Sequence, residues 1–128
     1  MRLLAAGLLA VLPAGSAGAA DWSKAREVVV VTTEYKFTPH SLRFRQGIAY
    51  RLHIANKGRE THEFTAPEFF KAVAARDMKP LNADHTEIVI QPGERKDFYF
   101  VAGTPGAFKL TCSDHDWAGM TGDIAIVR

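Results

Sequence analysis

The chain has 128 residues, 47% of them hydrophobic and 23% charged, a composition that fits one globular domain and argues against a disordered chain. Its 16 basic and 14 acidic residues leave a formal net charge of only +2. The basic residues are scattered singly and do not alternate with aromatic residues, so the sequence predicts no nucleic-acid partner.

The first twenty residues have the features of a secretory signal peptide. Arg2 supplies one positive charge, residues 3–12 are apolar, and Ala17-Gly18-Ala19 fits the small-residue cleavage motif. The apolar run is shorter than the roughly 20 residues that span a bilayer, and no later segment is apolar enough to do so. We therefore predict a signal peptide over residues 1–20 and one soluble, periplasmic domain over residues 21–128, without membrane insertion.

From Glu27 onward the hydrophobic pattern is that of short β-strands separated by turns. Strands are expected over residues 28–33, 41–45, 48–55, 60–65, 87–90, 98–101, 108–112 and 124–127. The segment Gln91-Pro92-Gly93-Glu94 has the central Pro and Gly that a type II turn prefers. Within residues 66–80, Pro67 and apolar residues at helical spacing predict one short helix. The predicted fold is an all-β, antiparallel Greek-key β-sandwich of about seven to eight strands.

The segment from Thr111 to Gly122 concentrates potential metal ligands. It holds the only cysteine, Cys112, followed by His115 and Met120 with the spacing C-x2-H-x4-M. These side chains can meet at one ion only in a tight loop, and Gly119 and Gly122 permit the positive φ angles that such a loop needs.

Soft sulfur ligands together with imidazole favour copper over other metals. Two histidines and a cysteine in one plane with a distant axial methionine form a blue-copper electron-transfer site. The loop lacks one of the two histidines, and His62 is our candidate for it. Alternation places Cys112 on the same face as Phe108 and Leu110, so its thiol is expected to point inward.

In these residues the chain resembles the cupredoxins, specifically the plastocyanin, pseudoazurin and amicyanin group of blue-copper proteins. The matching features are Asn56-Lys57-Gly58, His62, Cys112, His115, Met120 and the Gly119 that directly precedes the methionine. The resemblance implies one copper ion, cycling between Cu(I) and Cu(II), held by His62, Cys112, His115 and the weak axial ligand Met120. It also implies that electrons leave through His115.

One position departs from the pattern of the family. The residue after the first histidine is commonly asparagine, but here it is Glu63, whereas the hydroxyl after the cysteine is present as Ser113. If Glu63 accepts a hydrogen bond from Ser113 near the metal, its negative charge would lower the reduction potential and distort the site toward a green or red spectral type. Alternatively, Glu63 faces solvent and has no effect.

The sequence leads to a monomeric one-electron carrier that docks redox partner proteins near His115 and Trp117, the latter being either an exposed contact or a lid over the site. Asp114 and Asp116 flank His115 and predict a partner with a basic or mixed surface. The alternative function is a periplasmic copper carrier or copper-tolerance protein, although the chain lacks Met-rich or His-rich tracts. An enzyme is not expected, because a fully coordinated single copper leaves no open position for substrate.

Overall fold

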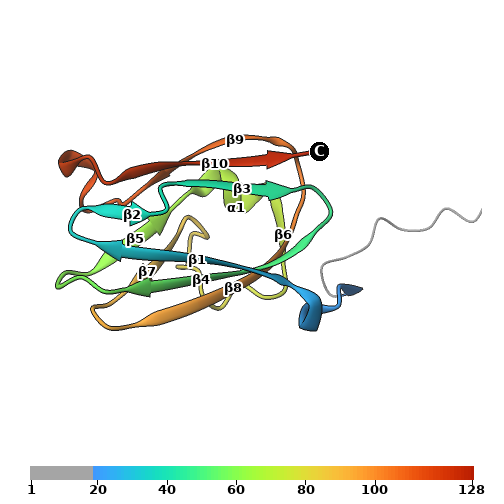
Figure 1. Cartoon of the computed structure of the whole chain (residues 1–128), viewed down its shortest axis with the longest axis horizontal. Helices are drawn as coiled ribbons and strands as arrows, with labels where there is room; N and C mark the ends of the chain where they lie inside the picture. The colour runs from blue at the N-terminus through green and yellow to red at the C-terminus, as the bar shows by residue number, and fades with distance from the viewer. Residues whose placement is uncertain (1–18) are drawn as a thin grey trace, which may run out of the picture.

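The computed structural model describes residues 19–128, so nearly all of the predicted signal peptide lies outside the described residues. Within them, ten strands form two five-stranded sheets that face each other in two layers (Figure 1). The strands are β1 (Arg26–Thr33), β2 (Lys36–Thr38), β3 (Ser41–Arg45), β4 (Ala49–Asn56), β5 (His62–Thr65), β6 (Val73–Ala75), β7 (Glu87–Ile90), β8 (Arg95–Ala102), β9 (Gly106–Thr111) and β10 (Thr121–Val127). The helices are α1 (Pro67–Lys71) and the 3-10 helices η2 (Trp22–Lys24) and η3 (Asp116–Ala118).

The predicted β-sandwich is confirmed, with two differences. One sheet has the strand order β2-β1-β4-β8-β6 and the other β3-β10-β9-β5-β7. The pairs β1–β4 and β3–β10 are parallel, whereas the other pairs are antiparallel. The chain passes through the opposite sheet between the members of each parallel pair and returns in the same direction. Ten strands are found because β2 and β6 have three residues each, too few for a visible alternation.

The core lies between the two sheets, where alternate residues of each strand point inward. Phe44 packs against Phe69 and Phe100 with ring centroids 5.6 Å and 5.1 Å apart, so strands of both sheets and helix α1 meet at one aromatic cluster. Both Phe69 and Phe70 are buried, as expected. Helix α1 is short because the chain pairs with β8, as strand β6, directly after it.

Residues 111–122, the segment that holds the potential metal ligands, lie at one end of the sandwich, on the left in Figure 1, where several turns and loops meet. The β1–β2 turn, the β4–β5 loop and the β9–β10 loop all lie there. The β7–β8 turn lies at the same end; its Gly93 has φ +79° and Glu94 N–H donates to the carbonyl of Gln91 at 2.9 Å, as a type II turn requires. No helix among residues 19–128 is long and apolar enough to cross a membrane.

On the outer face of the β4–β8 pair, Asp97 contacts the side chains of Arg51 and His53. Its Oδ1 lies 3.0 Å from Arg51 Nε and 2.7 Å from His53 Nδ1. Partial burial raises the pKa of Asp97, but the hydrogen bonds from Arg51 and His53 outweigh this effect and leave the pKa below its ordinary value. A carboxyl whose pKa is lower in the folded state stabilises the protein above its unfolded pKa, and that stabilisation disappears as the pH falls through the folded pKa.

We therefore expect Asp97→Asn to lower the free energy of unfolding at pH 7 by no more than about 1 kcal/mol, because the network is partly exposed to solvent. The difference from the parent should shrink below about pH 4 as Asp97 becomes protonated. Urea titrations of Asp97→Asn and of the parent, at pH 7 and below about pH 4, measure this difference in the free energy of unfolding. An undiminished difference at acid pH would mean that packing, not charge, accounts for the loss.

Candidate metal centre

The two halves of the centre come from neighbouring strands of one sheet. His62 is the first residue of β5, and Cys112 directly follows β9, which pairs with β5 at Thr65 and Thr111. Both side chains are fully buried. The inward direction predicted for the Cys112 thiol is confirmed, and the sheet pairing brings together two residues that lie 50 positions apart in the sequence.

The β9–β10 loop closes on itself through backbone hydrogen bonds. His115 N–H donates to the carbonyl of Cys112 at 3.1 Å, and Cys112 N–H donates to the carbonyl of Met120 at 3.0 Å. Gly119 has φ +78°, so its predicted left-handed conformation is confirmed. The same prediction for Gly122 is wrong. Gly122 lies in β10, and a Cβ atom there would collide with the carbonyl oxygen of His40, so this glycine provides space.

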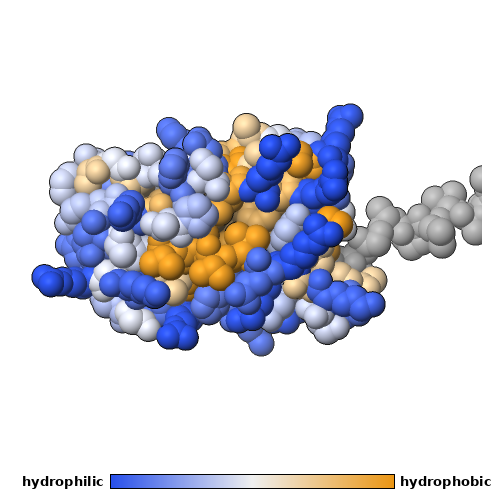
Figure 2. All heavy atoms as spheres, viewed as in Figure 1, coloured by the Kyte–Doolittle hydropathy of each residue, from blue (hydrophilic) through white to orange (hydrophobic). Residues whose placement is uncertain are grey.

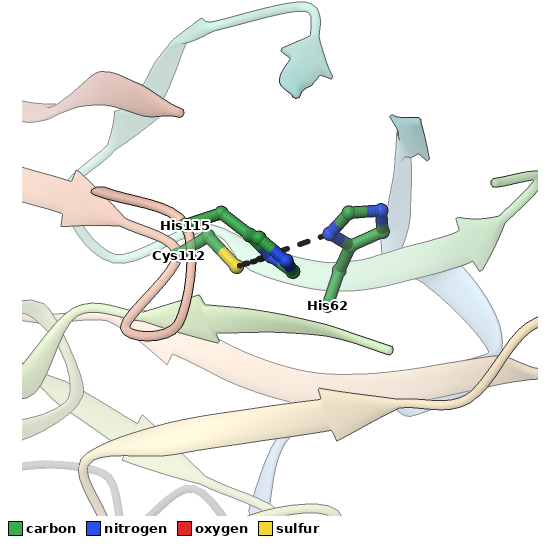
Figure 3. A group of neighbouring side chains, drawn as sticks. All are labelled: His62, Cys112 and His115. Atoms are coloured by element: carbon green, nitrogen blue, oxygen red, sulfur yellow. Dashed lines mark hydrogen bonds between the residues drawn. The ribbon is translucent and has the colours of Figure 1, made fainter. Parts of the chain in front are cut away.

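Three donor atoms converge inside this loop (Figure 3). The Sγ atom of Cys112 lies 3.4 Å from Nδ1 of His115 and 3.9 Å from Nδ1 of His62. The donor atoms of the three residues all lie within 4.8 Å of one another. The His62 side chain is fully buried, whereas that of His115 is 12% exposed, so the cluster reaches the surface at one histidine. Met120 is fully buried where the loop enters β10.

The Cys112 thiol lies in an apolar environment that opposes its ionisation. Burial, with a smaller contribution from the neighbouring Glu63 carboxylate, raises the pKa of Cys112 to about 12, against the effect of the Glu63 backbone N–H that points at the sulfur at 3.4 Å. A cation would reverse this preference, because metal ligation requires the thiolate and releases the proton.

Glu63 is turned inward, onto the sulfur. The residue is 4% exposed, and Cys112 Sγ donates to Glu63 Oε2 at 3.1 Å, so the solvent-facing alternative is wrong. Burial raises the pKa of Glu63. The expected hydrogen bond from Ser113 is also absent, because Ser113 Oγ donates instead to Oε1 of Glu87 on β7 at 3.0 Å. The Glu63 carboxyl group thus contacts the Cys112 sulfur, and the Ser113 hydroxyl group hydrogen-bonds the β9–β10 loop to β7.

The aromatic surface beside His115 consists of Tyr35 and Trp117. Trp117 is 75% exposed, so it does not form a buried lid, and its Nε1 donates to the carbonyl of Asp114 at 2.9 Å. The Tyr35 ring lies 4.9 Å from the His115 ring and 5.8 Å from the Trp117 ring. The His115 imidazole, the more exposed of the two in the cluster, is therefore bordered by two surface aromatic rings.

Sequence reasoning did not find Glu34, Tyr35 and Glu60, which lie in the β1–β2 turn and the β4–β5 loop. Glu34 Oε1 is 3.5 Å from Nε2 of His62, and Glu60 Oε2 is 3.6 Å from Nε2 of His115. No spacing rule links a turn near residue 34 to a histidine at position 62. The proximity of Glu60 to His62 in the sequence was the only available signal.

The sequence matches the family described as cupredoxin-like domain over residues 3–126. No curated protein matches it significantly. Among solved structures, auracyanin B is similar with a TM-score of 0.61 and 21% identity, covering 81% of this chain and 90% of that one. The reduced auracyanin of the photosynthetic bacterium Roseiflexus castenholzii gives a TM-score of 0.62 and 18% identity, covering 81% of this chain and 98% of that one.

A larger protein has the same fold in part of its chain. The McoA multicopper oxidase of the hyperthermophile Aquifex aeolicus gives a TM-score of 0.65 and 11% identity, covering 85% of this chain but only 31% of that one. At these identities the three structures support the fold.

The donor set fits copper. Two imidazole nitrogens and a cysteine sulfur within 4.8 Å, with a thioether in the same loop, are the soft and borderline donors that copper prefers. Structural zinc sites, by contrast, use four Cys or His ligands and no methionine. With the family match, this chemistry assigns one copper ion to the protein.

Glu63→Gln tests how the buried carboxylate affects the copper. If Glu63 is ionised beside the thiolate, its neutral isostere should raise the midpoint potential by on the order of 100 mV, since two unit charges about 4 Å apart interact by about 4 kcal/mol at an effective dielectric constant of 20. The intensity ratio of the visible thiolate-to-copper bands should also shift toward that of a blue site.

Glu87→Gln is the matched control, because Glu87 contacts Ser113 instead of the sulfur. Redox titration and absorption spectra of both variants provide the comparison. An unchanged or lower potential in Glu63→Gln would show that Glu63 carries a proton and donates a hydrogen bond to the thiolate.

Proposed function

Because this chain belongs to the cupredoxin-like domain family, we propose that it is an exported, periplasmic one-electron carrier whose single copper ion is held by His62, Cys112, His115 and Met120. The observation that carries this proposal is the meeting of two imidazole nitrogens and the only cysteine sulfur within 4.8 Å, directly below the surface at His115.

The roles of the residues follow from their chemistry. Bound copper supplies a one-electron change between Cu(I) and Cu(II). Cys112 binds as the thiolate, and the two neutral imidazoles bind both oxidation states. The thioether of Met120, a soft donor in the same loop, would favour the reduced state and raise the potential. The backbone hydrogen bonds between Cys112, His115 and Met120 hold the loop on two paired strands, so the ligands need to move little when the charge changes.

His115 is the proposed route for the electron. Among the three converging residues it has the most exposed side chain, and Tyr35 and Trp117 lie beside it. The end of the sandwich that carries these loops is mainly hydrophilic in the view of Figure 2. We expect redox partner proteins to dock there on a monomer, with the aromatic rings at the contact and charged groups around them. An ion held by all four residues would have no position left for a substrate, which favours a carrier over an enzyme.

The test is to load the chain from Asp21 to Arg128 with Cu(II) and to record visible spectra during a redox titration. We expect an intense thiolate-to-copper band that bleaches and returns reversibly. Cys112→Ser should lose the band but remain folded, since the apolar core is built without the metal. A colourless protein that binds Cu(I) while Cu(II) oxidises its thiol would contradict electron transfer and favour the copper-carrier alternative.

The acidic residues around His115 predict how charged partners approach. Asp114 and Asp116 are both exposed and flank the proposed electron route. In the double variant Asp114→Asn, Asp116→Asn, electron transfer to a cationic small-molecule oxidant should slow severalfold and depend less on salt, because electrostatic steering is weakened. Stopped-flow traces at several ionic strengths measure both effects.

A charge-matched control removes two exposed carboxylates far from this loop in the sequence, Glu68→Gln with Asp84→Asn. An anionic oxidant should react faster with the Asp114 and Asp116 variant and show little response to the control. Equal effects of both double variants would mean that only net charge matters and would remove the case for a docking face at His115.

A further inference from the structure

Each imidazole of the copper site has a carboxylate at its outer nitrogen. The Nδ1 atoms of His62 and His115 face the Cys112 sulfur. On the opposite side, Glu34 Oε1 lies 3.5 Å from Nε2 of His62, and Glu60 Oε2 lies 3.6 Å from Nε2 of His115. Both carboxylates come from loops outside the ligand segment, so their arrangement at the two histidines is a product of the fold.

Glu34 is fixed in position by the β4–β5 loop. Its Oε1 accepts hydrogen bonds from the backbone N–H groups of Arg59 and of Glu60, the latter at 2.7 Å. These bonds, that from Glu60 foremost, lower the pKa of Glu34. Gly58 leaves the space the carboxylate occupies, because a Cβ atom there would lie 2.5 Å from Glu34 Oε1. The carboxylate therefore lies in a place shaped for it.

The loop itself is anchored by Asn56, the last residue of β4. The buried Asn56 amide donates to the carbonyl oxygens of Glu60 at 2.8 Å and Ile90 at 2.9 Å, and its oxygen accepts from Gly58 N–H at 2.9 Å. One side chain thus holds the backbone that orients Glu34 and also carries Glu60. The positions of both carboxylates depend on the same anchor.

His62 needs the partner that Glu34 offers. Its Nε2 atom is buried and has no partner in hydrogen-bond geometry, and a buried N–H without an acceptor is costly. If Nδ1 ligates a metal, the neutral ring carries its proton on Nε2. The carboxylate of Glu34 is the group placed to receive that proton's hydrogen bond after a small approach from 3.5 Å.

His115 is held from two directions. Glu60 faces its outer nitrogen, and the Tyr35 ring lies against it with the ring centroids 4.9 Å apart. The nearby Glu60 carboxylate raises the pKa of Tyr35. Tyr35 therefore lies against the face of the imidazole, and Glu60 lies at its edge.

We propose that Glu34 and Glu60 are positioning residues that direct Nδ1 of His62 and of His115 toward the metal and, through their negative charges, favour Cu(II) over Cu(I). This inference rests on the proposed copper-carrier function. Carboxylate partners of metal-bound histidines fix the ring and its tautomer and raise the basicity of the ligand. Here a carboxylate oxygen lies within 3.6 Å of the outer nitrogen of each histidine.

The test compares Glu34→Gln and Glu60→Gln with Glu94→Gln in the copper-loaded chain. Glu94 lies at the same end of the sandwich, but its carboxylate contacts the Gln91 backbone and Lys96. All three variants remove one negative charge. We expect the first two to shift the Cu(I)/Cu(II) ratio toward Cu(I) by about tenfold at fixed potential, equivalent to about 59 mV, and to bind Cu(II) about tenfold more weakly in chelator competition. The control should show neither change.

Glu34→Ala separates position from charge, because glutamine keeps an oxygen acceptor and alanine does not. It should weaken Cu(II) binding beyond Glu34→Gln. Thermal melts of the metal-free variants test whether the β4–β5 loop tolerates the change, and the exposed Glu60 provides an independent variant if Glu34 variants fail to fold. Potentials and affinities equal to those of Glu94→Gln would overturn the inference while leaving the copper site intact. Failure of the parent to bind copper would instead overturn the proposed function.

Discussion

The pairing of β5 with β9 is the constraint on which the copper site depends. It puts His62 beside Cys112 although 50 residues separate them, and it does so inside a core that excludes water. Imidazole and thiol alone would bind many ions. Their rigid placement on two neighbouring strands, with the third donor in a loop closed by its own backbone hydrogen bonds, makes the geometry a property of the fold.

The sequence was sufficient for those features that local chemistry determines. Alternating apolar residues predicted the sandwich, and the spacing of Cys112 and His115 predicted one tight loop with a left-handed residue at Gly119. The parallel pairing of β1 with β4 and of β3 with β10 was not predictable, because the sequence pattern of a strand carries no direction. The reason for a glycine at position 122 was also not predictable, because a Cβ atom there would meet the backbone of His40, which is distant in the sequence.

Side chains around the donors were the least predictable part of the site. A family pattern directed attention to Glu63 and Ser113, yet their partners are Cys112 and Glu87, because the direction of each side chain follows the pleat of its strand. Glu34 and Tyr35 reach the histidines only because the β1–β2 turn lies over the site. Such contacts depend on how separate loops meet, and no periodicity in the chain records this.

The uneven burial of the two histidines also bears on how metal enters and leaves. His62 and Cys112 are sealed from solvent, and His115 is the one member of the three that is partly open. An ion entering the folded chain would therefore pass the same imidazole that we propose as the electron route. In the proposed carrier, a partner protein docked at His115 would cover this partly exposed ring, so the ion could not leave while the electron crosses.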